Sequence, residues 1–509
     1  MNRRDLFRAA GAAYVASTVA GIKGAAAMAN GTHAGAAGTA YRYRIGFGAW
    51  INDMRNEALP LEQWPAPQFD DITVESALMA ADALAESGYE YLDAFGLWAT
   101  NDYPPDIVGA FADEERNRRV RRVLQGAEKR GIHWVLPLGL FTWGYDRIIQ
   151  EDPEVRGKDN EGNPHPHAMC GAKEKAWSYV EKLIDTLFAQ HDFQAVHLES
   201  ADLGYCMCDQ CSGKYGAVGY NSRLNLRAAD YIKAAHPECV VYVCPINWVP
   251  FGLNADGVQP KVAPEDMPHI EELSKHIDIL MDQGHRGRFL AWESVPRLSC
   301  TYGTSGGLWA YHGCRMDRLS YCIPYPIRAA RYIADHHAHG TRAGLIYQGP
   351  MLNPAVEINS AVIGRMMCDV TRDPVAVLNE VIEVCYEPRS RATAEELGRI
   401  IVAVEDAYFG QWDEALFKKQ HGLEMPGEFC LGPLFNTSPD PAAYLMEPFL
   451  TADGRLALKE GLKAALRDLA AIQDEFHDHG RMARLKRSIG VMCQLLTSIM
   501  LAKGEAWAN

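Results

Sequence analysis

The chain has 509 residues, a formal net charge of −15 and a charged fraction of 23%. Its apolar content of 48% is ordinary for a globular protein, and the strong negative charge argues against nucleic acid as a partner. An anionic ligand would therefore need a local cluster of Arg or Lys side chains. After the N-terminal segment, no run reaches the roughly 18 consecutive apolar residues that span a bilayer, so we expect no membrane span.

The N-terminus resembles a twin-arginine export signal. Residues 2–8 carry paired arginines, an Ala-rich apolar stretch follows to Gly21, and residues 27–29 form a small-x-small cleavage site. We therefore predict a signal peptide over residues 1–29, a Gly/Ala/Thr-rich linker over residues 30–40, and a periplasmic or secreted mature protein. An ordinary basic tail is the alternative.

Strand-like apolar runs alternate with helical segments from about residue 43 to residue 350. The eight runs lie at residues 43–48, 89–95, 133–140, 195–199, 240–244, 277–282, 298–303 and 344–348. Between them, residues 73–88, with Thr73 as the cap, 114–129 and 174–189 have apolar residues at helical spacing. Eight βα units on one sheet predict an α/β fold, a (β/α)₈ TIM barrel, over residues 41–352.

The pattern changes after Pro350. Residues 355–368, 373–386, 392–408 and 455–505 have helical periodicity, while residues 410–450 are rich in proline and resemble a loop. We therefore expect a mainly helical C-terminal region over residues 353–509, packed on the barrel.

The fourth apolar run ends in two carboxylates, Glu199 and Asp202. Barrel enzymes place catalytic groups on the loops that leave the C-terminal ends of their strands. The other strand ends contribute polar and aromatic residues, a combination that suits hydroxyl groups and the flat faces of sugar rings. These residues are Trp50, Asp93, Trp98, Trp143, Asn247, Trp248, Asp282, His285, Arg286, Trp309, Tyr311, Arg315 and Tyr347.

Paired carboxylates across a cleft give glycoside hydrolysis an acid and a nucleophile or base. By position, the expected pair is Glu199 or Asp202 with Asp282, and His285 is close enough in sequence to transfer a proton near neutral pH. The remaining strand-end residues are expected to bind substrate. Each acid has an alternative role as a helix cap or ion-pair partner; for Asp93 this is a structural acid inside the barrel.

The chain has thirteen cysteines, most of them isolated in apolar segments. Cys206, Cys208 and Cys211 instead have Cys-x-Cys-x-x-Cys spacing, and Cys170 precedes the neighbouring helix. Four thiolates suit a structural, tetrahedral Zn²⁺. Disulfides formed after export and free thiols are the alternatives. We expect no cofactor for catalysis.

Two segments resemble uncharacterised bacterial relatives of α-glucuronidases. One runs from Cys170 through Glu199 and Asp202 to the Cys206–Cys208–Cys211 loop, and the other spans residues 357–386. The resemblance implies a TIM-barrel glycoside hydrolase. The chain departs from that pattern at Glu199, where a small or neutral residue is expected, and it has no counterpart of the N-terminal sugar-binding domain of true α-glucuronidases.

These patterns favour an exported glycoside hydrolase that acts on a plant or algal polysaccharide fragment. Arg286 and Arg315, in an otherwise acidic chain, favour an acidic sugar, either uronic or sulfated, because Arg binds carboxylate and sulfate groups bidentately. A non-catalytic carbohydrate-binding barrel is one alternative. A polysaccharide lyase or sugar epimerase is the other.

Overall fold

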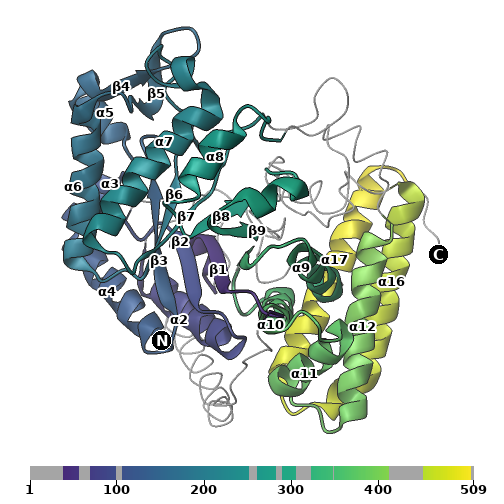
Figure 1. Ribbon diagram of the computed structural model, residues 1–509. Helices are drawn as coiled ribbons and strands as arrows, with labels where there is room; N and C mark the ends of the chain where they lie inside the picture. The colour runs from purple at the N-terminus through teal and green to yellow at the C-terminus, as the bar shows by residue number, and fades with distance from the viewer. Residues whose placement is uncertain are drawn as a thin grey trace.

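The computed structural model describes residues 38–56, 69–98, 106–250, 261–282, 289–304, 323–347, 349–411 and 451–505. Within these ranges, eight parallel strands close into a barrel (Figure 1) in the order β1-β10-β9-β8-β7-β6-β3-β2. The predicted (β/α)₈ barrel is therefore confirmed. The strands are β1 (Tyr43–Trp50), β2 (Tyr91–Phe95), β3 (His133–Gly139), β6 (Ala195–Glu199), β7 (Val240–Val243), β8 (Ile279–Asp282), β9 (Thr301–Thr304) and β10 (Ala343–Tyr347).

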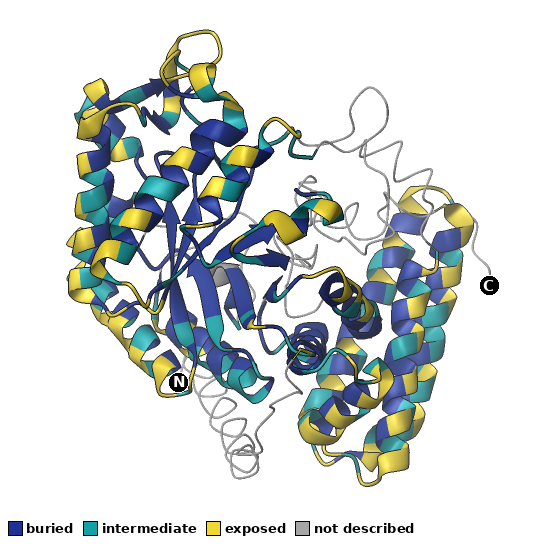
Figure 2. Cartoon of the chain, in the orientation of Figure 1, coloured by how far each residue is buried: buried dark blue, intermediate teal, exposed yellow. Residues whose placement is uncertain are grey.

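Each of the eight apolar runs overlaps one barrel strand. Strands of a parallel barrel are covered on both faces, so they form nearly continuous apolar runs instead of alternating ones. Figure 2 shows them as the most buried part of the molecule. Side chains two residues apart share a face, which places His197 and Glu199 of β6 on the same side of that strand.

Helices surround the barrel. They are α2 (Asp71–Glu86), α3 (Ile107–Ala112), α4 (Glu114–Glu128), α5 (Asp146–Glu151), α6 (Glu174–Gln190), α7 (Ser212–Ala235), α8 (Met267–Leu273) and α9 (Pro326–Ala338), with 3-10 turns η1 (Ile51–Met54), η3 (Pro153–Val155) and η5 (Trp292–Arg297). The start of α2 differs from the prediction. Asp70, not Thr73, is the N-cap, because its carboxylate accepts the backbone N–H of Thr73 at 3.0 Å.

An antiparallel hairpin stands between β3 and α6 that the sequence analysis did not predict. It consists of β4 (Arg156–Lys158) and β5 (Pro164–Met169). Pro164 and Pro166 argue against a central strand because proline has no backbone N–H to donate. Here they are tolerated because the sheet has only two strands, and each strand therefore has a free edge.

The C-terminal region is helical, as predicted. It contains α10 (Pro354–Cys368), α11 (Pro374–Tyr386), α12 (Arg391–Phe409), α16 (Ala452–Ile472), η6 (Gln473–Glu475) and α17 (His479–Ala502). The helical segment predicted near residues 455–505 consists of two helices. The chain leaves α16 at buried Phe476, which bridges to Pro388, and Asp478 then caps α17 by accepting the N–H of Arg481 at 2.9 Å.

Helices α9 and α10 lie between the barrel and the helices α12, α16 and α17 (Figure 1). Glu405 of α12 joins the two parts, because its buried carboxylate accepts the backbone N–H groups of Ile327 and Arg328 at 3.0 and 2.7 Å. These donors belong to the first turn of α9, where helical N–H groups have no partner within the helix. Burial raises the pKa of Glu405 to about 7.

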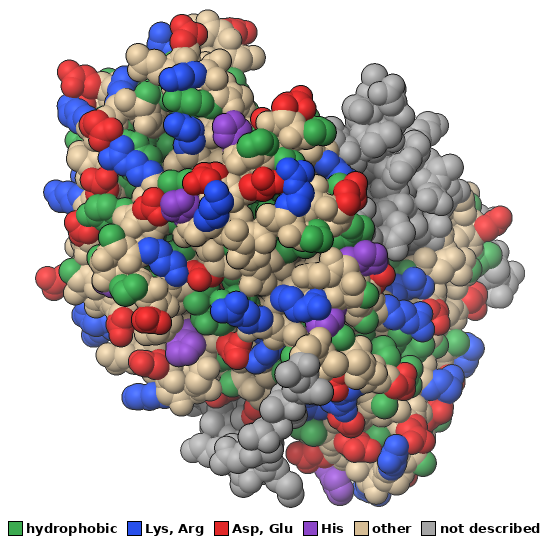
Figure 3. Space-filling model, in the orientation of Figure 1, with side chains coloured by type: hydrophobic (Ala, Val, Ile, Leu, Met, Phe, Trp, Pro, Cys, Tyr) green, Lys and Arg blue, Asp and Glu red, His purple; other side chains and the backbone are tan. Residues whose placement is uncertain are grey.

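Of the described helices, α17 alone is long and apolar enough to cross a bilayer by length and composition. It packs along α16 and against α10, so its apolar residues also contact other helices of the C-terminal region. On the face seen in Figure 3, acidic and basic side chains are interspersed.

Candidate functional site

The C-terminal ends of the barrel strands bring several predicted residues to one end of the barrel. Trp50, Glu199, Asp282 and Tyr347 are the last residues of β1, β6, β8 and β10. Because all the barrel strands are parallel, these four ends open on the same side. For Trp50 and Tyr347 the structure describes the backbone only. This end of the barrel is where TIM-barrel enzymes carry their active sites.

Glu199 lies above a polar network inside the barrel. One of its carboxylate oxygens, Oε2, is 3.6 Å from Nε2 of His197, and the side chain is only 8% exposed. Nδ1 of His197 is hydrogen-bonded to Oδ2 of Asp93 at 2.9 Å. The same Asp93 oxygen accepts the hydroxyl of Tyr242. Asp93, His197 and Glu199 therefore form a line of three ionisable groups from the barrel interior to its mouth.

The His197 ring is enclosed by aromatic side chains from three other strands. It stacks on Tyr242 of β7 with the centroids 4.6 Å apart, and meets Phe95 of β2 and Phe47 of β1 edge-on at 5.4 and 6.4 Å. Burial, and then the neighbouring Asp93, raise the pKa of Tyr242 well above its usual value, so Tyr242 remains a hydroxyl donor. This enclosure keeps bulk water away from the network and strengthens its electrostatic interactions.

The geometry of the line fixes which nitrogen of His197 faces Glu199. With Nδ1–H donated to Asp93, Nε2 is an acceptor when the ring is neutral and a donor when it is protonated. The Nε2–Oε2 separation of 3.6 Å is longer than a hydrogen bond, so the two groups interact through charge and a proton can reside on either one. The arrangement can therefore supply one proton at the mouth of the barrel and take it back.

Asp202 lies on the loop after β6 and is partly exposed. Asn247, on the loop after β7, donates its side-chain amide to the carbonyls of Ala201 and Asp202, both at 3.1 Å. Asn247 itself has a left-handed backbone with φ of 59°, a conformation that Asn adopts more readily than most residues. Asn247 therefore holds the loop that carries Asp202 in place through these two hydrogen bonds.

Asp282 lies at the same end of the barrel but is 2% exposed. Its Oδ2 accepts the backbone N–H of Phe289 at 2.9 Å and the hydroxyl of Tyr302. Trp248 is likewise buried and packs edge-on against Phe289 at 6.0 Å. Both residues hold the chain that returns after β8, and Trp248 offers no open face to a sugar.

Two other predicted substrate contacts are also in the core. Asp93 is fully buried beneath Glu199, which matches its alternative role as a structural acid inside the barrel. Trp98 packs on His191 and Phe193, which precede β6 and so lie toward the opposite end of the barrel. The chain turns outward after β2 because the guanidinium of Arg116 holds the carbonyls of Gly96 and Leu97.

Trp143 is 8% exposed and meets Phe95 edge-on at 4.8 Å, so it supports the wall of the polar network. The remaining predicted residues lie outside the described residues, and their roles stay predictions. They are His285, Arg286, Trp309, Tyr311 and Arg315.

The sequence analysis missed His197, Tyr242 and Tyr302, which position the acids. His197 could have been predicted, because it lies two residues before Glu199 and therefore on the same face of the strand. Tyr242 and Tyr302 stand in strands with no nearby polar pattern, so their contacts to Asp93 and Asp282 could not be inferred.

The four predicted metal ligands converge behind this site. The sulfur atoms of Cys170, Cys206, Cys208 and Cys211 all lie within 4.8 Å of one another. Hydrogen bonds from the thiols of Cys206 and Cys211 lower the pKa of Cys170 to about 4, while the bond to Cys170 raises that of Cys211. Cys206, Cys208 and Cys211 follow Asp202 on the segment between β6 and α7, and Cys170 joins them from the end of β5.

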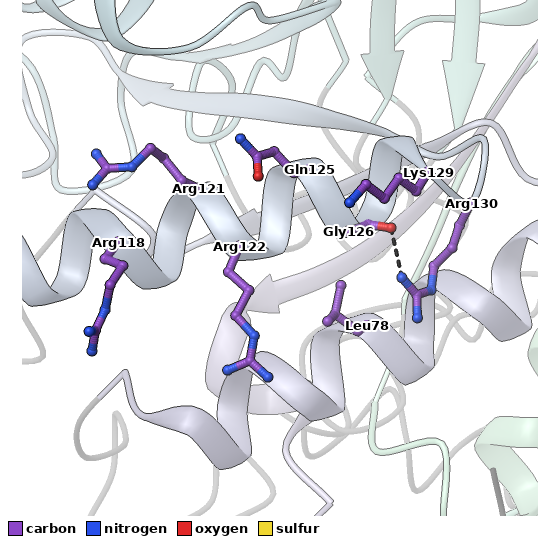
Figure 4. Close-up of a pocket in the computed structure, with 8 residues that line it drawn as sticks. All are labelled: Leu78, Arg118, Arg121, Arg122, Gln125, Gly126, Lys129 and Arg130. Atoms are coloured by element: carbon purple, nitrogen blue, oxygen red, sulfur yellow. Dashed lines mark hydrogen bonds between the residues drawn. The ribbon is translucent and has the colours of Figure 1, made fainter.

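A basic groove of about 440 Å³ lies on the outer side of α4 (Figure 4). Three arginines of α4 and its C-terminal end pair with acids of α2: Arg119 with Asp71, Arg122 with Glu75 and Arg130 with Asp82. The arginines therefore have a structural role in joining the two helices. The groove is lined by Leu78, Arg118, Arg121, Arg122, Gln125, Gly126, Lys129 and Arg130.

Solved structures with a similar fold include glycoside hydrolases. A GH138 enzyme that targets pectin rhamnogalacturonan II aligns with a TM-score of 0.50 at 12% identity, over 90% of this chain and 57% of its own. The chain therefore shares a TIM-barrel fold with this enzyme. A chitobiase from Flavobacterium johnsoniae aligns over 92% of this chain and 73% of its own, with a TM-score of 0.42 at 12% identity.

No family model matches the chain, and no curated protein matches it in sequence. The chain spans little more than half the length of the GH138 enzyme, so that enzyme's activity does not transfer with the fold. The likeness to α-glucuronidases stays a prediction.

Proposed function

We propose that the chain is an exported glycoside hydrolase that cleaves a glycosidic bond in a plant or algal polysaccharide fragment. The observation that carries the proposal is Glu199, a nearly buried carboxyl group at the C-terminal mouth of the barrel, placed 3.6 Å from a histidine that is itself bonded to Asp93. Such a line serves proton transfer to and from a bound substrate.

Glu199 is the general acid in this proposal. Its carboxyl group donates a proton to the glycosidic oxygen as the bond to the leaving sugar breaks. His197 and Asp93 do not touch the substrate; they position Glu199 and hold its proton. The side chain of Glu199 is only 8% exposed, so its carboxyl group is largely shielded from bulk water.

Asp202 is the second carboxylate. It is partly exposed on a loop fixed by Asn247, whereas Asp282 is buried and already accepts two hydrogen bonds. An accessible, held carboxylate suits attack on the anomeric carbon or activation of a water. Asp282 then maintains the shape of the mouth.

The proposed substrate is an acidic sugar, and the support is the sequence position of Arg286 and Arg315 just after two barrel strands. A solved neighbour that aligns with a TM-score of 0.50 targets pectin rhamnogalacturonan II. Faster cleavage of a uronic-acid-capped oligosaccharide than of its neutral counterpart would support this specificity. Equal or faster cleavage of the neutral sugar, unaffected by Arg286→Ala or Arg315→Ala, would rule out an arginine clamp.

The reaction is tested by screening the purified protein on aryl glycosides and pectic oligosaccharides. The turnover of two site variants is then measured on the best substrate. Glu199→Gln and Asp202→Asn should each reduce turnover at least ~100-fold with the fold intact. Glu238→Gln, an exposed acid before β7 at the other end of the barrel, should keep full activity. If both site variants retain full activity, the assignment is wrong.

The leaving group separates the two roles. Dinitrophenolate leaves without being protonated, so a dinitrophenyl glycoside as substrate should restore much of the activity of Glu199→Gln but not that of Asp202→Asn. The opposite pattern would exchange the roles of the two acids.

A further inference from the structure

Four cysteines from two separate loops meet at one point beside the candidate site. Cys170 directly follows β5, Cys206 and Cys208 stand on the loop between β6 and α7, and Cys211 is the N-cap of α7. Their sulfur atoms lie within 4.8 Å of one another, and no other group of His, Cys, Asp or Glu side chains among the described residues has such a geometry.

The spacing of the sulfurs is that of a metal tetrathiolate. A Zn–S bond of about 2.3 Å in a tetrahedral site places neighbouring sulfurs about 3.8 Å apart. Sγ of Cys170 lies 3.9 Å from Sγ of Cys208 and 3.6 Å from Sγ of Cys211. A disulfide needs about 2.05 Å and joins sulfurs in pairs, whereas here Cys170 is nearly equidistant from two partners.

The surroundings suit the negative charge of a metal-bound thiolate group. The backbone N–H of Lys158 on β4 points at Sγ of Cys206, 3.4 Å away. The cluster is shielded from solvent, since Cys170, Cys206 and Cys211 are buried and Cys208 is half-buried.

We propose that Cys170, Cys206, Cys208 and Cys211 bind one Zn²⁺ as a structural site. Binding releases the thiol protons, and the four thiolates close the metal's coordination, which leaves no open position for chemistry. The metal fastens the hairpin β4–β5 to the loop that carries Asp202. The backbone N–H of Met207, which donates to the carbonyl of Lys158 at 2.8 Å, marks the same junction.

The first experiment measures metal in the full-length chain, purified without an affinity tag. We expect about one zinc per chain, retained on dialysis against a weak chelator. A Co²⁺-substituted sample should show the intense thiolate-to-metal charge-transfer absorption of a tetrahedral site. A metal content below about 0.1 per chain with four reactive thiols, a mass lower by the hydrogens of two disulfides, or one iron in place of zinc would overturn the assignment.

Variants locate the site. Cys170→Ser and Cys211→Ser should lose zinc, while Cys239→Ser and Cys368→Ser, which change buried cysteines outside the cluster, should keep it. If the cluster variants do not fold, the wild-type protein still decides. A strong chelator should lower its Tm by roughly 5 °C or more, and added zinc should restore it. An unchanged Tm on metal removal would contradict a structural role. None of these readouts depends on glycosidase activity.

Discussion

Replacing Asp93 by Asn would test the line of groups below Glu199, because it removes a buried charge and leaves the side chain's shape nearly unchanged. In the native protein Oδ2 of Asp93 accepts two hydrogen bonds, from His197 and Tyr242. A hydrogen bond to a charged group contributes about 1.5–3 kcal/mol, and a neutral one about 0.5–1.5 kcal/mol. Two bonds that each lose about 1 kcal/mol should lower the free energy of unfolding by about 2 kcal/mol.

The same substitution should change catalysis in a defined direction. Loss of the negative charge makes it harder to hold the proton on His197 or Glu199. The basic limb of the pH profile of kcat/KM, which reports the loss of that proton, should therefore move to lower pH. We expect kcat to fall, but by less than the ~100-fold or more expected for Glu199→Gln.

Tyr242→Phe is the matched control, since it removes one hydrogen bond to Asp93 and keeps the charge. It should lower stability while moving the basic limb less than Asp93→Asn does. Urea unfolding followed by tryptophan fluorescence gives the stability, and initial rates across pH on the best substrate give the profile. If Asp93→Asn lowers stability but leaves both kcat and the basic limb unchanged, the Asp93–His197 pair is structural only.

Three further predictions follow from other contacts. Burial lowers the pKa of His191 to about 4, so the stability that the neutral ring allows above pH 6.5 is lost as the pH falls toward 4, by at most about 3 kcal/mol. The Tm of His191→Gln should therefore depend less on pH over that window, and an identical dependence would exclude His191 as the cause. Asn247→Ala should cost about 2 kcal/mol in chemical unfolding and reduce turnover, because it removes two hydrogen bonds and strains a backbone with φ of 59°. Asn247→Gly accepts that φ but also lacks the amide, so it should recover only the backbone part of the stability and not the turnover; full recovery of both would show that only the backbone matters. Glu405→Ala removes the acceptor of two N–H groups of α9 and should lower the free energy of unfolding by about 2 kcal/mol, whereas Asp406→Ala, at an exposed neighbour, should lower it much less. Equal losses would mean that these two hydrogen bonds do not stabilise the fold.

The barrel could be predicted from sequence because each of its strands is a short apolar run separated from the next by a helical segment. Glu199 could be found for the same reason, since it is the last residue of such a run. The hairpin β4–β5 could not, because Pro164 and Pro166 argue against a strand, and the pairing of two short edges overrides that local preference.

The contacts of Asp93 with His197 and Tyr242 could not be predicted from the sequence for a different reason. His197 and Asp93 are 104 residues apart, and Tyr242 and Asp93 are 149 residues apart, so only barrel closure brings them together. Trp98 was misplaced by a related effect. Its position after β2 predicted a place at the mouth, but the contacts of Arg116 with the carbonyls of Gly96 and Leu97 turn the chain outward.

The most direct test of the proposed reaction is cleavage of an active oligosaccharide in water enriched in oxygen-18, with the products weighed by mass spectrometry. Hydrolysis predicts that one oxygen from the solvent enters the newly formed reducing end, and that Glu199→Gln suppresses this product. Cleavage that yields an unsaturated sugar without solvent oxygen would identify a lyase. Isomerised sugar without cleavage would indicate an epimerase, and tight binding with no turnover on any substrate would leave a carbohydrate-binding barrel; each of these would contradict glycoside hydrolysis.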